Sequence, residues 1–477
     1  MAGVGFELKT LFNRRTLTGQ VMAYGYSAII TAGPFALLTA MVLLIQLLFM
    51  NYGISGEAGQ LYTVSVVYPF VFSQLLTCGF GMVITRYLAD KLYEGEYDNV
   101  SGSCYGIIFM VQLIGAVLAA AFYWNKPLSV EVKLATYVFF MDMIAVWLQG
   151  VYLTALKDYK AIFLSYTGGI AVSVLLAWAN LHLGLLEPVF CAMAAMSIGT
   201  GCIAAAFMIQ IVRYFGYGGS GLNFEFLPYF EMHYKLFLVA FCYTLALYTA
   251  NFFVWIGPWG QVVEGYLFAP RYDIITFYAF LSILPSMIMF VVSMELNFYE
   301  QYAIYFTYVT QKGTFQDIED SRKDLLHTLW NEFKNIMEFQ LVFSLMFLAA
   351  GGYLLSLGSV GYEGVNIYRL LVLGAFFNAV LQVGYTLLLY LEDQRGALVI
   401  AGSFLAANII FGALGYIIGE VSYGFSFFLS AMVAATVAVA RLQYFCQRIN
   451  YFVFCGRPVF FEAPDWIFSK LARMLYK

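Results

Sequence analysis

The sequence predicts an all-α integral membrane protein with twelve transmembrane helices in two pseudo-symmetric six-helix bundles and both termini in the cytosol. Three observations support this fold class. Of the 477 residues, 62% are hydrophobic and only 11% are charged, whereas soluble domains carry about 25% charged residues. Apolar runs of roughly 20 residues, the length needed to cross the bilayer, recur along the chain. Short polar motifs also recur in matching order in its two halves.

Twelve apolar runs are long enough to span. The first is much longer than the roughly 7–15 residues of a signal-peptide core, so we expect it to remain in the membrane. The runs lie near 24–50, 61–85, 104–124, 134–155, 161–181, 187–212, 236–256, 272–296, 337–357, 367–391, 397–418 and 422–446.

The basic residues predict the orientation of these spans, because Lys and Arg concentrate on the cytosolic side of membrane proteins. With both termini placed in the cytosol, only Lys126, Lys133, Arg271 and Arg369 of the 24 basic residues fall on the outer side. The chain is therefore expected to begin and end in the cytosol.

The two halves of the chain carry similar motifs. LKDYK at 156–160 follows the fourth span, and LEDQR at 391–395 follows the tenth. GEYDNV after the second span resembles GTFQDI after the eighth, and prolines Pro69 and Pro285 are expected to break those two spans. A repeat with an even number of spans keeps its orientation, so the halves should be related by an axis along the membrane normal, facing each other across a central cleft.

These observations divide the chain into four parts. Residues 1–213 form an N-terminal bundle with an amphipathic front segment, and residues 214–235 form a cytosolic linker. Residues 236–446 form the C-terminal bundle, which includes an amphipathic cytosolic segment at 297–336. Residues 447–477 form a cytosolic tail that resembles an interfacial helix.

Charged residues inside the membrane are candidates for a transport pathway, because they are costly unless they face a cavity or a partner. Asp142 is the clearest case, roughly 12 Å below the outer surface at 1.5 Å per residue. It could couple a proton or cation, bind a sugar hydroxyl, or simply be a packed and neutralised acid. The other candidates are charges at span ends, which snorkelling explains equally well: Arg271, Asp273 and Arg369 on the outer side, and Arg86 and Glu295 on the inner side.

Two further groups of candidate residues lie on the cytosolic side, one in the repeated motifs and one in the segment after the eighth span. The repeated motifs place one group at a cytosolic mouth, where Asp158 and Asp393 could cap or tether helix ends or take part in gating. This mouth group comprises Lys157, Asp158, Lys160, Glu392, Asp393 and Arg395.

The segment from Thr314 to about Ile336 reads as an amphipathic helix that begins with a capping pair, Thr314 and Asp317. It could lie along the bilayer surface or dock a cytosolic partner. The candidate docking residues on its charged face are Glu319, Asp320, Lys323 and Asp324.

No metal site or cofactor is predicted. The seven cysteines and three histidines are scattered, and no C-x-x-C pair is present. The 37 tyrosines suit a carbohydrate path, since each offers a flat apolar face and a hydroxyl, but interfacial anchoring also uses tyrosine.

Several stretches resemble a known family. MAGVGFELKTLF and LTGQVMAYGYSAIITAGPF near the N-terminus, TRYLADKLYEGEYDNV after the second span, and FYEQYAIYF with GTFQDIEDSR after the eighth are similar to the PelG family. The resemblance covers essentially the whole chain. It implies a fold like that of the MATE transporters, within the multidrug/oligosaccharidyl-lipid/polysaccharide (MOP) exporter superfamily.

The resemblance also implies a function and partners. The protein would be a bacterial inner-membrane transporter of a Pel-type exopolysaccharide, an N-acetylhexosamine-rich polymer of the biofilm matrix. Its implied partners are a PelF-like cytosolic glycosyltransferase, a PelD-like cyclic-di-GMP receptor and a PelE-like membrane protein. It supplies no catalytic residues, and no nucleic-acid partner is expected.

Other functions are compatible with the residues alone. An ion-coupled drug or small-molecule antiporter, or a lipid-linked oligosaccharide flippase, could use the same scaffold. A membrane glycosyltransferase is disfavoured, because the longest internal loop has only about 40 residues and offers no room for a catalytic domain.

Overall fold

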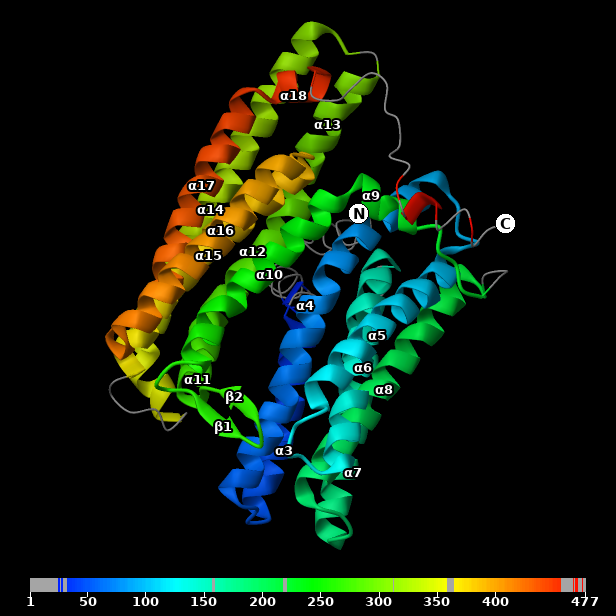
Figure 1. Ribbon diagram of the computed structural model, residues 1–477. Coiled ribbons are helices and arrows are strands. Elements are labelled where there is room, and N and C mark those ends of the chain that lie inside the picture. Colours follow the sequence, from blue (N-terminus) through cyan, green and yellow to red (C-terminus); the bar gives the residue numbers. More distant parts are fainter. Residues whose placement is uncertain are drawn as a thin grey trace. The chain divides into compact units, whose positions relative to one another are not determined.

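The computed structural model describes residues 32–156, 159–217, 221–311, 313–357 and 364–455, together with residues 25, 27, 28, 466, 468–470 and 474. Within this part of the chain, twelve helical segments are long and apolar enough to cross a membrane, which confirms the predicted number of spans. The elements in chain order are α3 (Gly33–Asn51), α4 (Gly56–Glu94), α5 (Val100–Tyr123), α6 (Val130–Leu156), α7 (Tyr159–Leu183), α8 (Pro188–Phe215), α9 (Leu227–Met232), α10 (Tyr234–Trp255), β1 (Gln261–Val263), β2 (Tyr266–Phe268), α11 (Pro270–Phe280), α12 (Leu284–Ser293), α13 (Tyr299–Thr310), α14 (Phe315–Leu357), α15 (Gly364–Tyr390), α16 (Gln394–Ile418), α17 (Phe425–Gln447) and α18 (Ile449–Cys455) (Figure 1).

The chain folds into two compact units. Unit 2 comprises Gly33–Tyr248, Gln261–Phe268 and Phe461–Lys477, and unit 1 comprises Met1–Ala32, Thr249–Gly260 and Ala269–Phe460. The boundary between them falls within α10. The hairpin β1–β2 and the last described residues therefore belong with the helices of the first half of the chain, although they follow the seventh and twelfth spans.

In unit 2, helix α4 shows why its ends fall where they do. The Ser55 hydroxyl accepts a hydrogen bond from the backbone N–H of Ala58, and Gly95 ends the helix with a left-handed φ of 76°. Pro69 does not break this helix, contrary to the sequence prediction. A membrane-spanning helix can lose one backbone hydrogen bond at a proline when its surroundings satisfy the freed groups, so α4 continues through it.

Small residues bring the helices of unit 2 into close contact. A Cβ atom placed on Gly169 of α7 would lie 2.5 Å from the carbonyl oxygen of Gly199 on α8. A Cβ on Gly199 would lie 2.6 Å from the carbonyl oxygen of Gly169. The backbones of α7 and α8 thus touch directly, as small residues permit in membrane helix pairs.

The linker between the halves packs against α5. The backbone N–H of Asn223 donates to the carbonyl of Gly102, and a Cβ on Gly106 would lie only 2.2 Å from the carbonyl oxygen of Asn223. The two glycines of α5 therefore allow the backbone of the linker to approach this helix closely.

The hairpin β1–β2 is an element that the sequence reasoning missed. Its strands pair from Gln261 opposite Phe268 to Val263 opposite Tyr266, and Glu264 and Gly265 turn between them with positive φ angles of 45° and 83°. The hydroxyl of Tyr68 donates to the Leu267 carbonyl at 2.7 Å and accepts from the Leu267 N–H at 3.0 Å. A single tyrosine of α4 thereby satisfies both backbone groups of one strand residue.

In unit 1, α14 is a continuous helix of 43 residues. At 1.5 Å per residue it is roughly 65 Å long, about twice the hydrocarbon thickness. The predicted Thr314–Asp317 capping pair is confirmed: the N–H of Thr314 donates to the Asp317 carboxylate at 2.9 Å, and the N–H of Asp317 donates to the Thr314 hydroxyl at 3.2 Å.

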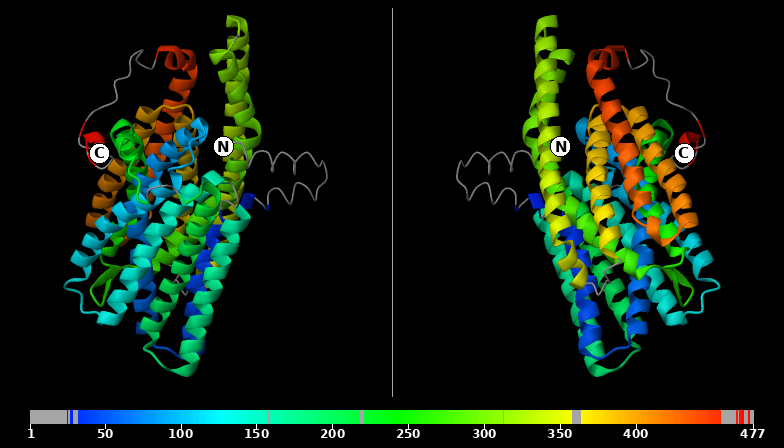
Figure 2. Two further views of the ribbon diagram at one scale, coloured as in Figure 1. Left: turned by 90° about the vertical axis from the view of Figure 1, so that its right-hand side faces the viewer. Right: turned by 90° about the vertical axis from the view of Figure 1, so that its left-hand side faces the viewer.

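The amphipathic segment expected at 297–336 is not a separate surface helix. Its first part is α13, and its second part is the beginning of α14, which continues without a break into the predicted ninth span. Figure 2 shows α13 and the first half of α14 side by side, extending beyond the ends of α15 and α16.

Candidate transport site

Asp142 lies on α6 and faces α8. The hydroxyl of Thr200 donates to its carboxylate at 3.4 Å. Gly201 leaves space beside it, because a Cβ atom there would lie 3.6 Å from a carboxylate oxygen. Within the described part of the chain, no cation forms an ion pair with Asp142. The carboxylate therefore keeps acceptor capacity for a proton, a cation or a hydroxyl, and the choice among the predicted roles stays open.

Other polar groups of unit 2 connect α4 to its neighbours. The indole N–H of Trp147 on α6 donates to the Ser73 hydroxyl on α4 at 3.0 Å, and the Tyr248 hydroxyl on α10 donates to the Gln74 side chain on α4. The side chains of Ser103 and Tyr152 are hydrogen-bonded at 3.0 Å between α5 and α6. These hydrogen bonds satisfy polar side chains inside the helical bundle, so these side chains need no water there.

The eighth span is discontinuous, and the break has a local cause. Helix α11 ends at Phe280, a 3₁₀ turn covers Leu281–Ile283, and Pro285 occupies the first turn of α12. Proline has no N–H to donate to the Leu281 carbonyl four residues before it, and this carbonyl accepts a hydrogen bond from the Leu284 N–H instead. The amide of Gln340 on α14 donates to the Ser282 carbonyl at 3.2 Å. The predicted break at Pro285 is confirmed, and Gln340 connects α14 to the 3₁₀ turn beside it.

The same span contains a π-helical turn at Met294–Phe298. Single π turns within α-helices are frequent at functional sites. The Glu332 carboxylate on α14 accepts hydrogen bonds from the Ser293 hydroxyl at 2.6 Å and from the Asn297 amide at 2.7 Å. Sequence reasoning missed Glu332, because its partners lie more than 30 residues away. The side chain of the predicted residue Glu295, in this turn, is outside the described part of the structure.

The predicted outer charges take different positions. Asp273 is enclosed: its carboxylate accepts from the Asn251 amide at 2.8 Å, the Trp255 indole at 3.0 Å and the Ala269 N–H at 3.4 Å. It fastens the end of α10 to the beginning of α11. Arg271 and Arg369 are both exposed.

On the predicted inner side, Arg86 forms an ion pair with Asp90 one turn further along α4, at 3.3 Å. Asp393 caps α16 by accepting from the Gly396 N–H at 2.9 Å. Its cationic partner is Arg441 of α17, not the neighbouring Arg395.

The other mouth residues differ in how far the structure describes them. Glu392, Arg395 and Lys160 are exposed. Lys157 and Asp158 lie outside the described residues. The structure thus shows a helix-capping contact at the second repeated motif.

The predicted docking residues occupy two faces of α14. Glu319 turns inward, where it pairs with Arg322 at 3.0 Å and accepts from Asn450 at 3.4 Å. Asp320 and Lys323 pair on the exposed face at 3.3 Å, with 56% and 60% of their side chains accessible. Asp324 is also exposed.

The twelve apolar spans of the described residues define the class of protein: a polytopic membrane protein. Solved structures with the same fold include the outward-facing conformation of a multidrug resistance MATE family transporter of the MOP superfamily, at 13% identity and a TM-score of 0.61, with 89% of this chain and 96% of that chain covered. A MOP superfamily transporter from Pyrococcus furiosus has 11% identity and a TM-score of 0.61, with 89% and 96% covered. The Vibrio cholerae MATE transporter VcmN in the bent form has 14% identity and a TM-score of 0.59, with 94% and 99% covered.

The amino-acid sequence shows to which family this chain belongs. The profile of the PelG family, described as "Putative exopolysaccharide Exporter (EPS-E)", matches residues 1–454, and the chain belongs to this family. A comparison with curated proteins finds no match. Family and fold are those of transporters.

Proposed function

We propose that this protein exports a Pel-type, N-acetylhexosamine-rich exopolysaccharide from the cytosol across the bacterial inner membrane for the biofilm matrix. The observation that carries the proposal is the match of an exopolysaccharide-exporter family over residues 1–454. The two-unit helical fold shared with MOP transporters supports it, because that fold is found in transporters.

A transported polymer needs polar groups along its path through the membrane, and two features of the described spans support the proposal. Asp142 of α6, beside the Thr200 hydroxyl, places one carboxylate within a predicted span. The π turn held by Glu332 gives the eighth span a second irregular region on the predicted cytosolic side.

Export is best tested by deleting the gene in its own bacterium and measuring matrix polymer with a lectin for N-acetylhexosamines. Surface polymer should disappear, and re-expression should restore it. Cytosolic polymer or its precursor should be measured in parallel, since a synthesis defect removes both pools. Unchanged surface polymer in the deletion strain contradicts the proposal.

We also propose that the exporter is coupled to a PelF-like cytosolic glycosyltransferase, with PelD-like and PelE-like proteins in the same assembly. The extension formed by α13 and the first half of α14 offers the docking surface. Its exposed acidic residues Asp320 and Asp324 are the appropriate pair to change to lysine, because Glu319 holds Arg322 and its reversal would damage the fold.

The Asp320→Lys, Asp324→Lys variant should lose co-purification of the glycosyltransferase. A matched control is Glu338→Lys, further along the same helix in an exposed i,i+4 pair. Equal recovery of the glycosyltransferase with the wild-type exporter, the double variant and the Glu338→Lys control rules out docking at this face.

A second candidate function is ion-coupled antiport of a small molecule, which the placement of Asp142 beside Thr200 favours. It predicts altered tolerance to toxic compounds and intact surface polymer in the deletion strain. The two functions are therefore separated by the same strain.

A further inference from the structure

A groove lies between α14 and α17 in unit 1. Residues at intervals of four along α14, Arg322, Leu326 and Trp330, form one wall. The other wall comes from the end of α17. The cavity has a volume of about 600 Å³, within the range of about 300–1,000 Å³ usual for small-ligand sites. The residues of the second wall are Val439, Gln443, Cys446 and Gln447.

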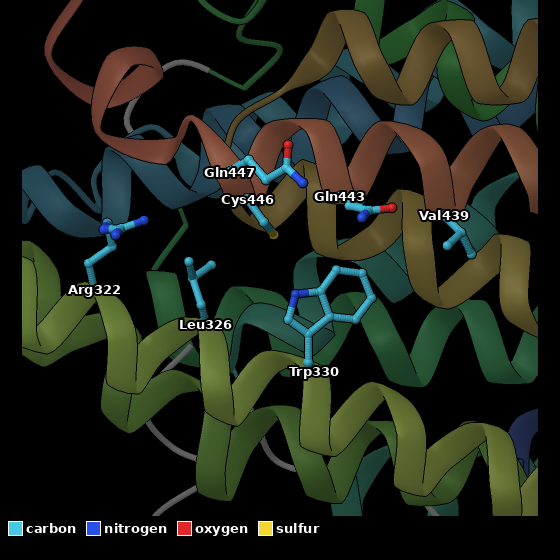
Figure 3. A pocket seen from close by; sticks show the side chains of 7 residues that line it. All are labelled: Arg322, Leu326, Trp330, Val439, Gln443, Cys446 and Gln447. Carbon is cyan, nitrogen blue, oxygen red and sulfur yellow. The ribbon is translucent and has the colours of Figure 1, made fainter.

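The arrangement of side chains can be followed in Figure 3. The indole of Trp330 points from α14 toward α17, across from Gln443 and Cys446. Trp330 is half-buried, while Gln443 and Gln447 are exposed. Because these two glutamines are four residues apart, they lie on the same face of α17.

The chemistry of this groove is that of a polar, uncharged ligand with flat apolar faces. An indole offers a rigid apolar surface and one N–H donor. Each glutamine offers a carbonyl acceptor and an NH₂ donor. Among the described residues, neither glutamine amide nor the Trp330 indole N–H has a hydrogen-bond partner, so these groups remain available to a ligand.

The charges around the groove are already neutralised or directed elsewhere. The Arg322 guanidinium is held by two hydrogen bonds to the Glu319 carboxylate. On α17, Arg441 is paired with Asp393. Arg448 donates to the Tyr444 hydroxyl at 2.9 Å. An anionic group, such as a phospholipid phosphate, would therefore find no unpaired cation among the residues that line the groove.

A hydrogen-bond network also fixes the wall that carries Trp330. The Tyr305 hydroxyl of α13 donates to Asn450 at 3.0 Å, and the Asn450 amide donates to Glu319 at 3.4 Å. Glu319 in turn positions Arg322. Helices α13 and α14 and the short helix α18 are thus connected beside the groove, which makes it a preorganised surface.

We propose that this groove binds a short stretch of neutral carbohydrate chain, with Trp330 as the stacking surface and Gln443 and Gln447 as hydrogen-bond partners of sugar hydroxyl or N-acetyl groups. The proposal rests on the proposed export function. The beginning of α14 and the end of α17 both lie on the predicted cytosolic side, so a polymer arriving from the cytosol would meet this groove as it enters the membrane.

The test uses the full-length protein in lipid nanodiscs and measures binding of the tetramer of N-acetylglucosamine by calorimetry. Trp330→Ala should weaken binding by about tenfold or more, whereas Trp330→Phe, which keeps an aromatic face, should retain most of it. The double variant Gln443→Ala, Gln447→Ala should weaken binding to a similar degree.

Two controls make the result specific. Trp124→Ala removes a tryptophan that is 82% exposed and far from the groove in the sequence, and it should leave binding unchanged. Thermal unfolding of each variant shows that the fold is intact. Absence of binding to the wild-type protein, or equal affinity of Trp330→Ala and Trp124→Ala, overturns the proposal.

Failure of this inference differs from failure of the proposed function. If deletion of the gene abolishes surface polymer but Trp330→Ala exports normally and binds the tetramer normally, the export function stands and the groove is not its sugar site. If deletion leaves surface polymer intact, the export function itself is wrong.

Discussion

Asp393 at the beginning of α16 and Arg441 near the end of α17 form a two-nitrogen salt bridge, with distances of 2.8 Å and 3.1 Å. Only 7% of the Asp393 side chain is accessible, and Arg441 is 28% accessible. The aspartate also caps α16, so one carboxylate stabilises a helix end and a helix pair.

Removing this carboxylate should destabilise unit 1. Asp393→Asn leaves the partly buried guanidinium of Arg441 without its carboxylate partner. We expect the free energy of unfolding to fall by about 2–3 kcal/mol, because the desolvation of the remaining charge is then no longer compensated. The midpoint of thermal unfolding in detergent measures the change. Asp320→Asn, in the exposed pair with Lys323, should cost well under about 1 kcal/mol. Equal effects of the two variants contradict the structural role assigned to Asp393.

Export should depend on the carboxylate of Asp142. Asp142→Asn preserves the shape and the contact with Thr200 but removes the negative charge, so export should fall while the amount of protein in the membrane stays normal. Thr200→Val, which replaces the hydroxyl with a methyl group and keeps the charge of Asp142, should have a smaller effect. Polymer on the cell surface and protein in the membrane fraction are measured together. Normal export by Asp142→Asn removes this residue from the transport pathway.

The contact between α7 and α8 should tolerate no side chain at Gly169. Gly169→Ala places a methyl group 2.4 Å from an Ile203 carbon and 2.5 Å from the Gly199 carbonyl, and overpacking of this kind costs about 1–3 kcal/mol or more. The neighbouring Gly168 is a matched control, since a Cβ there meets no atom within 4 Å. Gly168→Ala should leave thermal stability unchanged or raise it slightly. Equal stabilities of the two variants would show that the helices are not in backbone contact.

Glu231 should hold the C-terminal residues against α9 in a pH-dependent way. Its carboxylate accepts from the N–H groups of Trp466 at 3.1 Å and Phe468 at 2.6 Å, and from the N–H and hydroxyl of Ser469. Burial alone would raise the pKa of Glu231, but the hydrogen bonds from Ser469, Phe468 and Trp466 outweigh it and lower the pKa below its ordinary value of 4.5. Because the folded-state pKa is lowered, this contact is fully stabilising above pH 4.5 and is lost as the pH falls through the lowered value.

A spin label at Met474→Cys, in a background with Cys202 and Cys455 changed to serine, reports on this contact. The label should be restrained at neutral pH and become more mobile as the pH falls below about 4.5. Glu231→Gln should give the mobile spectrum already at pH 7. A restrained label in the glutamine variant means that other contacts hold these residues.

The sequence predicted the spans well, and the limits of that prediction have physical causes. Hydropathy over a bilayer-length window identifies each span, because hydrocarbon imposes one requirement on every spanning helix. It did not reveal that the amphipathic helix before residue 337 is continuous with the ninth span, because charged residues such as Lys334 lower the average hydropathy where the two join. The hairpin β1–β2 was missed because its three-residue strands give no periodic signal.

Side-chain partnerships were the least predictable part. Local signals revealed the caps at Thr314 and Asp393, whose partners lie three residues away. Arg441 is 48 residues from Asp393, and Glu332 is 39 residues from Ser293. Such pairs depend on how helices pack in space, and no spacing rule in one sequence indicates them.

The most direct test of the central claim is movement of polymer by the purified exporter together with its glycosyltransferase in sealed vesicles of inside-out orientation. Nucleotide sugar is supplied outside, and N-acetylhexosamine polymer is measured after digestion of everything accessible to an added glycosidase. Export predicts protected polymer inside the vesicles only when the exporter is present. Equal protection with and without the exporter, at equal total synthesis, contradicts the account.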